Sequence, residues 1–96
     1  DRRILAEEGF VSVYAVVETT TGTILAGPHI QARGVAEDDS VFEEILPDVT
    51  EALSAALETG KADAYSLQQV MRRTLGRWIG RRLRRRPMIV PVVIEA

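Results

Sequence analysis

The clearest structural signal in this chain of 96 residues lies in Phe10–Val17, FVSVYAVV, where β-branched and aromatic residues predominate. Every odd-numbered position in it is apolar, whereas the even-numbered positions include Ser12 and Tyr14. This alternation predicts a β-strand with one buried face and one mixed face. A polar run with one glycine follows at 18–23 and favours a hairpin turn, so Thr23–Arg33 is expected to return beside the first strand.

The prolines indicate where each strand lies within the sheet. Gly27-Pro28 interrupts the second strand, and Pro91 interrupts a third apolar stretch, Met88–Glu95. Proline has no N–H for a sheet ladder, so both strands are expected at a sheet edge or next to a bulge. These signals do not decide the strand order, for which we expect 2-1-3, with the third strand beside the first.

Two stretches between the second and third strands have apolar residues three and four apart, which predicts amphipathic helices. The first follows Ser40, which forms a capping-box pattern with Glu43, and it ends at Thr59-Gly60. Pro47 lies within this pattern and either kinks the helix or restarts it.

The second helix is expected from Ala64 to about Arg84, with Asp63 as its N-cap and Pro87 beyond its end. Its expected core-facing residues are Leu67, Val70, Met71, Thr74, Leu75, Trp78, Ile79 and Leu83. The order ββααβ predicts a single α+β domain over residues 1–96. Two helices should cover one face of a small three-stranded sheet.

The composition excludes several kinds of active site. The chain has no cysteine and one histidine, His29, so neither a thiolate site nor a His-rich metal centre can be assembled from it. The acids at 37–39 and 43–44 do not match a calcium loop and are better explained as a solvated helix start. No catalytic or nucleotide-binding motif is present, so we expect no metal or cofactor in this chain. No apolar run would serve as a signal peptide or membrane span, which favours a cytoplasmic location.

Charge is divided sharply along the chain. Residues 1–63 carry thirteen acids and four bases, whereas the remainder carries eight arginines and one acid. At 100° per residue, Arg73, Arg77 and Arg84 should lie within about 40° of one another on the second helix, with Arg81 beside them. Three explanations remain open. These arginines face solvent or pair with acids of the first helix, they bind RNA phosphates, or they meet an acidic partner such as a second copy.

Two glycines interrupt the same helix. Gly76 and Gly80 are four residues apart on its expected outer face. Glycine in a helix interior costs up to about 1 kcal/mol relative to alanine. The pair is therefore either merely tolerated or allows another backbone to approach, in a self-contact or a contact with the rest of a longer chain.

Several segments, taken in order, resemble a known family. They are Leu5–Val11 (LAEEGFV), Ala26–Pro28 with Ala32–Gly34 (AGP and ARG), Arg72–Trp78 (RRTLGRW) and Arg85–Glu95 (RRPMIVPVVIE). Together they are similar to the C-terminal domain of bacterial ribonuclease J, particularly its actinobacterial form. Two positions depart from the family pattern. Val35 stands where an aromatic residue is common, and His29 stands where a carboxylate or another polar residue is expected.

The resemblance implies an accessory role. The family's parent enzyme is a zinc-dependent ribonuclease of the metallo-β-lactamase and β-CASP type, with 5′→3′ exonuclease and endonuclease activity in mRNA decay and rRNA maturation. Its metal-binding H-x-H-x-D-H motif lies in the N-terminal catalytic region and has no match here, so no catalytic residue is expected in this chain. The family's C-terminal domain is a three-stranded sheet with two helices, associated with self-association and full activity. The implied partners are the rest of the chain, further copies and, through the parent, RNA.

The residues also allow an alternative that needs no resemblance. The domain could be a free-standing RNA-binding α+β module that uses the arginines of its second helix. An affinity for RNA that falls steeply with salt would favour this alternative.

Overall fold

The centre of the sheet is the strand that the alternating pattern predicts. The computed structural model describes residues 9–96, in which β1 (Phe10–Glu18) lies between β2 (Thr23–Arg33) and β3 (Met88–Glu95). β1 pairs with β2 in the antiparallel sense and with β3 in the parallel sense. The observed order β2-β1-β3 confirms the predicted order 2-1-3.

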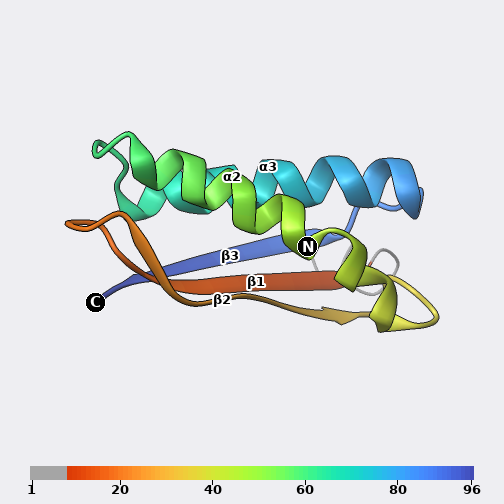
Figure 1. Cartoon of the computed structure of the whole chain (residues 1–96). Helices are drawn as coiled ribbons and strands as arrows, with labels where there is room; N and C mark the ends of the chain where they lie inside the picture. Colours follow the sequence, from red (N-terminus) through yellow and green to blue (C-terminus); the bar gives the residue numbers. More distant parts are fainter. Residues whose placement is uncertain (1–8) are drawn as a thin grey trace.

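Two helices connect β2 to β3. They are α2 (Leu46–Glu58) and α3 (Ala64–Arg82), and a short 3-10 helix, η1 (Asp39–Glu44), precedes them. Figure 1 shows α2 and α3 side by side over one face of the sheet. β2 ends and β3 begins at the same end of the sheet, where Arg33 and Met88 both pair with Phe10. The two helices therefore lead the chain away from this end and back again, and carry it across β1 from one edge of the sheet to the other. The predicted α+β fold with the order ββααβ is confirmed.

Both edge strands carry the prolines that predicted their positions. Pro91 lies in β3 and Pro28 in β2, and each strand has β1 as its neighbour on one side only. The Gly27-Pro28 bond is cis, and the pairing register shifts between Tyr14 and Val16 at this point. The missing N–H of proline is tolerated here because one side of each strand has no partner strand within residues 9–96.

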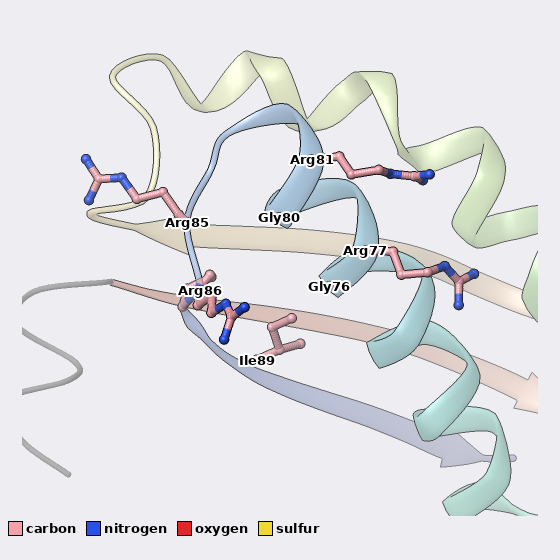
Figure 2. A pocket seen from close by; sticks show the side chains of 8 residues that line it. Gly76, Arg77, Gly80, Arg81, Arg85, Arg86 and Ile89 are labelled. Atoms are coloured by element: carbon pink, nitrogen blue, oxygen red, sulfur yellow. The ribbon is translucent and has the colours of Figure 1, made fainter.

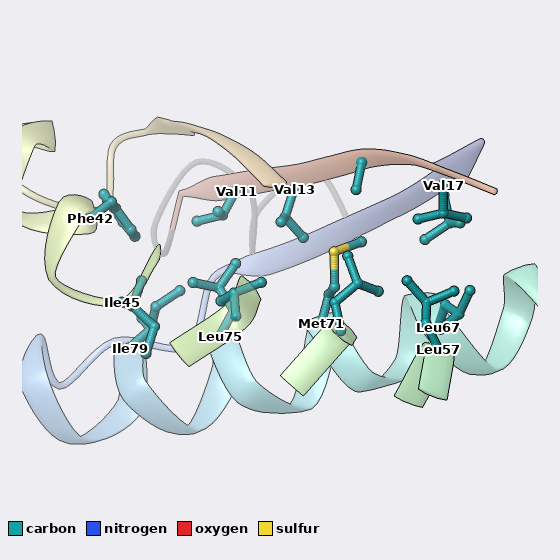
Figure 3. Close-up of a cluster of buried hydrophobic side chains, with 14 of the residues drawn as sticks. Val11, Val13, Val17, Phe42, Ile45, Leu57, Leu67, Met71, Leu75 and Ile79 are labelled. Atoms are coloured by element: carbon teal, nitrogen blue, oxygen red, sulfur yellow. The ribbon is translucent and has the colours of Figure 1, made fainter. Parts of the chain in front are cut away.

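The core lies between the sheet and the helices (Figure 3). The odd-numbered residues of β1 are almost completely buried, as predicted: Val11, Val13, Ala15 and Val17. Four residues of α3 have no exposed surface: Leu67, Met71, Leu75 and Ile79. The other expected core residues of this helix are half-buried: Val70, Thr74, Trp78 and Leu83. Full burial of a large apolar side chain contributes about 1.5–3 kcal/mol, so this layer is the main source of stability.

The first predicted helix is divided in two at Pro47. The 3-10 helix η1 ends at Glu44 and α2 begins at Leu46, so Pro47 lies in the first turn of α2 and restarts the helix. The prediction of Ser40 as N-cap is wrong. The Asp38 carboxylate caps η1 by accepting a hydrogen bond of 2.9 Å from the Ser40 N–H. An uninterrupted α-helix would press the Pro47 ring against a carbonyl of the preceding turn, which explains the division.

The helix α3 begins as predicted, with Asp63 as its N-cap, but it ends earlier than predicted. Its last residue is Arg82 rather than Arg84, and the N–H of Leu83 donates the closing hydrogen bond to the Ile79 carbonyl at 2.9 Å. Arg84 has a φ of 57°, in the left-handed region. This conformation ends the helix and turns the chain towards β3.

Candidate interface on helix α3

Three of the four candidate arginines form a ridge along the outside of α3. Arg73, Arg77 and Arg81 follow one another at intervals of four residues and are exposed. Figure 2 shows the side chains of Arg77 and Arg81 leaving the helix on the same side. No ion pair between residues 9–96 involves these three guanidinium groups. The arginine ridge therefore presents positive charge to the solvent.

Arg84 lies outside this ridge. The prediction that it lies within about 40° of Arg73 and Arg77 assumed that the helix continues to residue 84. Because α3 ends at Arg82, the helical projection does not apply to Arg84, and its predicted place on the helix is wrong. The cause is the left-handed turn that directs the chain into β3.

A hollow of about 440 Å³ lies beside the ridge, between α3 and the chain that leads into β3 (Figure 2). Pro87 and Ile89 form its apolar part, and Gly76 and Gly80 lie on its helix side. Arginines line the remainder: Arg77, Arg81, Arg85 and Arg86. A surface of this kind suits a group that combines an apolar part with negative charge.

The two candidate glycines have different surroundings. A Cβ at Gly76 would lie 3.3 Å from the Cδ1 atom of Ile89, so this glycine lets α3 pack closely against β3. Its expected position opposite the core is therefore wrong. A Cβ at Gly80 would meet nothing within 4 Å. The close packing against Ile89 thus explains why a glycine stands at position 76. A contact of either glycine with another chain remains a prediction.

Arg82 forms an ion pair that sequence reasoning missed. Arg82 and Glu44 are joined by two contacts, Nε to Oε1 at 3.1 Å and Nη2 to Oε2 at 3.2 Å. The Glu44 carboxylate raises the pKa of Arg82, mainly through this hydrogen bonding. The pair ties η1 to the end of α3, but both side chains are about half exposed, at 51% and 49%. Such a pair is worth little in stability and acts chiefly as a positional restraint.

A second missed residue is Gln68, which lies on α3 next to β3. Its side-chain oxygen accepts a hydrogen bond of 3.1 Å from the Val93 N–H. The bond spans 25 residues of sequence, so no local pattern could have indicated it. It satisfies an amide on the free edge of β3, which would otherwise be half-buried without a partner strand.

The remaining candidate groups form no cluster. Within residues 9–96, no three histidine, cysteine or acidic side chains converge as metal ligands would. Asp38 serves as the cap of η1, and the hydrogen bond from the Ser40 N–H lowers its pKa. His29 packs its ring against Tyr14 on the sheet, with centroids 5.0 Å apart.

None of the helices within residues 9–96 has the length and apolar character needed to cross a membrane.

Comparison with known proteins identifies one family that matches the whole chain. The model of the family described as "Ribonuclease J C-terminal domain" matches residues 1–96. Ribonuclease J from Mycobacterium tuberculosis (strain CDC 1551 / Oshkosh) is 41% identical over 93 residues, which cover 97% of this chain and 17% of that protein. Ribonuclease J from Mycolicibacterium smegmatis is 39% identical with the same coverage. Ribonuclease J 2 from Staphylococcus aureus (strain NCTC 8325 / PS 47) is 33% identical over 98 residues, covering 99% of this chain and 18% of that protein. The chain therefore spans about a sixth of the length of these relatives.

Proposed function

We propose that this chain, which belongs to the ribonuclease J C-terminal domain family, is the accessory domain of a longer ribonuclease and contributes to that enzyme's self-association. One observation carries the proposal. The family model matches the whole chain, yet the chain spans about a sixth of its relatives. On this proposal the catalytic part lies elsewhere in the parent enzyme. The parent's exonuclease and endonuclease activities in mRNA decay and rRNA maturation, and its cytoplasmic location, belong to the same proposal.

The residues of this chain do not fit the zinc site that the family implies. A hydrolytic zinc site needs about three protein ligands, usually histidines and a carboxylate. The chain has one histidine and no cysteine, and no three candidate ligands converge within residues 9–96. We therefore assign zinc binding and phosphodiester hydrolysis to the remainder of the parent enzyme.

Cleavage of RNA by the isolated chain tests the assignment of catalysis. The chain is incubated with zinc and a 5′-monophosphorylated RNA, beside the full-length parent as a positive control. We expect cleavage by the parent and none by the chain alone. Cleavage by the chain that EDTA abolishes would overturn this part of the proposal.

Sedimentation of the parent enzyme tests the contribution to self-association. The full-length parent and a version without this domain are compared at the same concentrations. We expect the shortened enzyme to dissociate at higher concentrations than the full-length enzyme. Equal dissociation constants for the two proteins would contradict the proposal.

The arginine ridge supports a second candidate function, which is RNA binding by the domain itself. Arg73, Arg77 and Arg81 carry exposed charge without an ion-pair partner within residues 9–96, and guanidinium groups bind phosphate oxygens in a bidentate manner. Each phosphate that is neutralised releases counterions, so the affinity would fall steeply with salt.

Filter binding at several salt concentrations tests this second function. If the ridge binds RNA, Arg73→Glu combined with Arg77→Glu should abolish the salt-dependent affinity of the chain. Arg72→Glu is the matched control, since Arg72 is exposed on the same helix but lies about 100° away from Arg73. Binding that is weak and unchanged by the double substitution would exclude RNA binding by the ridge.

A further inference from the structure

Within residues 9–96, the face of the sheet turned away from the helices is largely apolar and uncovered, and we call it the open face. Figure 1 shows α2 and α3 over the opposite face only. The even-numbered residues of β3 all point to the open face and are between 38% and 53% exposed: Met88, Val90, Val92 and Ile94. Tyr14 lies beside Val92 in the register of β1 and is 36% exposed. Contiguous apolar surface of this kind commonly marks an interaction site.

The free edge of β3 is poorly suited to pairing with another strand. The N–H of Met88 donates to Gly9 and that of Ala96 to Val17, so even-numbered amides point to β1 and odd-numbered amides to the free edge. At the middle of this edge, Pro91 has no N–H. The next outward amide, that of Val93, is already bound by the Gln68 side chain. A partner is therefore expected on the face of the sheet and not along this edge.

The charges at the two ends of the open face are opposite. Arg33 lies at one end, opposite Phe10 in the register, and Glu18 lies at the other end of β1. The positions between them on this face carry no formal charge with His29 neutral. Phe10 and Glu18 are eight positions apart, which is about 26 Å along the strand.

We propose that this open face packs against the same face of a second copy, with β1 antiparallel to its counterpart about a two-fold axis near Tyr14. In this arrangement each Arg33 meets Glu18 of the other copy, because Tyr14 is the middle residue of β1. The apolar residues of β3 are covered at the same time. The inference rests on the proposed function, to which it adds the contact surface and its orientation.

The open face is too small to hold two copies of the isolated domain together stably. Three strands of eight residues have a footprint of about 400 Å² per copy, whereas a stable interface buries about 800 Å² per partner. The contact is therefore weak by itself and adds to contacts made by the rest of the parent enzyme. Its test uses the full-length parent.

Charge reversal distinguishes a second copy from any other occupant. The Arg33→Glu enzyme carries acids at both ends of the face, and the Glu18→Arg enzyme carries bases at both ends. Each should self-associate at least about tenfold more weakly than the unaltered parent, since like charges would then face each other. An equimolar mixture of the two, measured by sedimentation equilibrium, should recover most of the lost affinity.

A second pair of variants tests the apolar part of the contact. Val92→Lys should also weaken self-association by at least about tenfold, because a charge would be buried at the centre of the contact. Tyr65→Lys is the matched control, since Tyr65 is 68% exposed but lies at the start of α3, away from the open face. Circular dichroism of each variant confirms that the domain remains folded.

Each outcome decides a separate point. If the unaltered parent is monomeric, the proposed function itself fails. If the parent associates and no substitution weakens it, the open face is not the contact. If the single charge reversals weaken association but the mixture does not recover it, the face binds another part of the parent chain, and the two-fold contact is wrong.

Discussion

At the scale of single residues, local hydrogen bonding explains where helices begin. The Asp63 carboxylate accepts a hydrogen bond of 2.8 Å from the Ser66 N–H, and the Ser66 hydroxyl accepts one of 3.1 Å from the Asp63 N–H. These bonds satisfy two backbone amides that would otherwise lack partners at the start of α3. The hydrogen bond from the Ser66 N–H lowers the pKa of Asp63.

This lowered pKa predicts how the stability of the domain depends on pH. A carboxylate with a lowered pKa stabilises the folded state above its unfolded pKa, and the effect is lost as pH falls through the folded pKa. We expect Asp63→Asn to melt at a lower temperature than the original chain at neutral pH, with the difference shrinking below about pH 4. Asp63→Ala, which removes the cap, should melt about 5 °C lower at neutral pH. A difference between Asp63→Asn and the original chain that grows on acidification would contradict this account.

The two glycines of α3 allow a comparison within one helix. At Gly80 an added Cβ meets open space, so Gly80→Ala should stabilise the domain by about 0.5–1 kcal/mol through helix propensity. At Gly76 the same change crowds the Cδ1 atom of Ile89, so the gain should be smaller or absent. Urea unfolding of both variants measures the difference. Equal stabilisation would show that the Ile89 side chain moves aside without cost.

At the scale of elements, β3 is stabilised on its two sides by different means. Its hydrogen bonds to β1 are those of a parallel pair, whereas its free edge is partly covered by the Gln68 side chain of α3. Pro91 removes a further donor from that edge. The strand therefore depends on α3 for its position, as well as on β1.

Removal of the Gln68 side chain should expose this dependence. Gln68→Ala leaves the Val93 N–H without its partner, which should lower the free energy of unfolding by about 1 kcal/mol. Gln69→Ala serves as the control, because Gln69 is also half-buried on α3 but has no hydrogen bond to β3 within residues 9–96. Equal losses for the two variants would show that the bond to Val93 contributes nothing.

At the scale of the whole molecule, a single core joins all the elements. Side chains from β1, η1, α2, α3 and β3 belong to one buried cluster, and partly buried side chains of β2 pack against it: Ile24, Ile30 and Ala32. The only tryptophan, Trp78, packs its ring against Phe42 with centroids 5.4 Å apart, which links α3 to η1. The arginine-rich second half of the chain thus meets the acidic first half through this apolar contact and through the Arg82–Glu44 pair.

A shared core predicts cooperative unfolding of the isolated chain. Fluorescence of Trp78 reports the contact between α3 and η1, whereas far-ultraviolet circular dichroism reports the helices as a whole. Because the α3–η1 contact and the helices belong to the same core, the two signals should give the same urea midpoint. An earlier transition in the fluorescence signal would mean that η1 detaches before the rest of the domain unfolds.

The features predicted correctly from sequence depend on neighbours within a few residues. The alternation in β1, the cap at Asp63 and the prolines at the sheet edges all reflect backbone geometry and local hydrogen bonding. Such interactions are present wherever the chain segment is placed, so the element order and the α+β fold were predictable. Helical periodicity placed Arg73 and Arg77 together with Arg81 beside them in the same way, but it placed Arg84 with them wrongly, because α3 ends at Arg82.

The sequence alone therefore determined the strands, the helices and the buried side of each. The tertiary structure decided where α3 ends and which side chains meet across the fold. Glu44 and Arg82 are 38 residues apart, and Gln68 and Val93 are 25 residues apart. These contacts form only when distant segments are brought together by the core, so no local spacing encodes them. The same holds for the make-up of the open face, because Arg33, Tyr14 and Val92 come from three different strands that only the fold brings side by side.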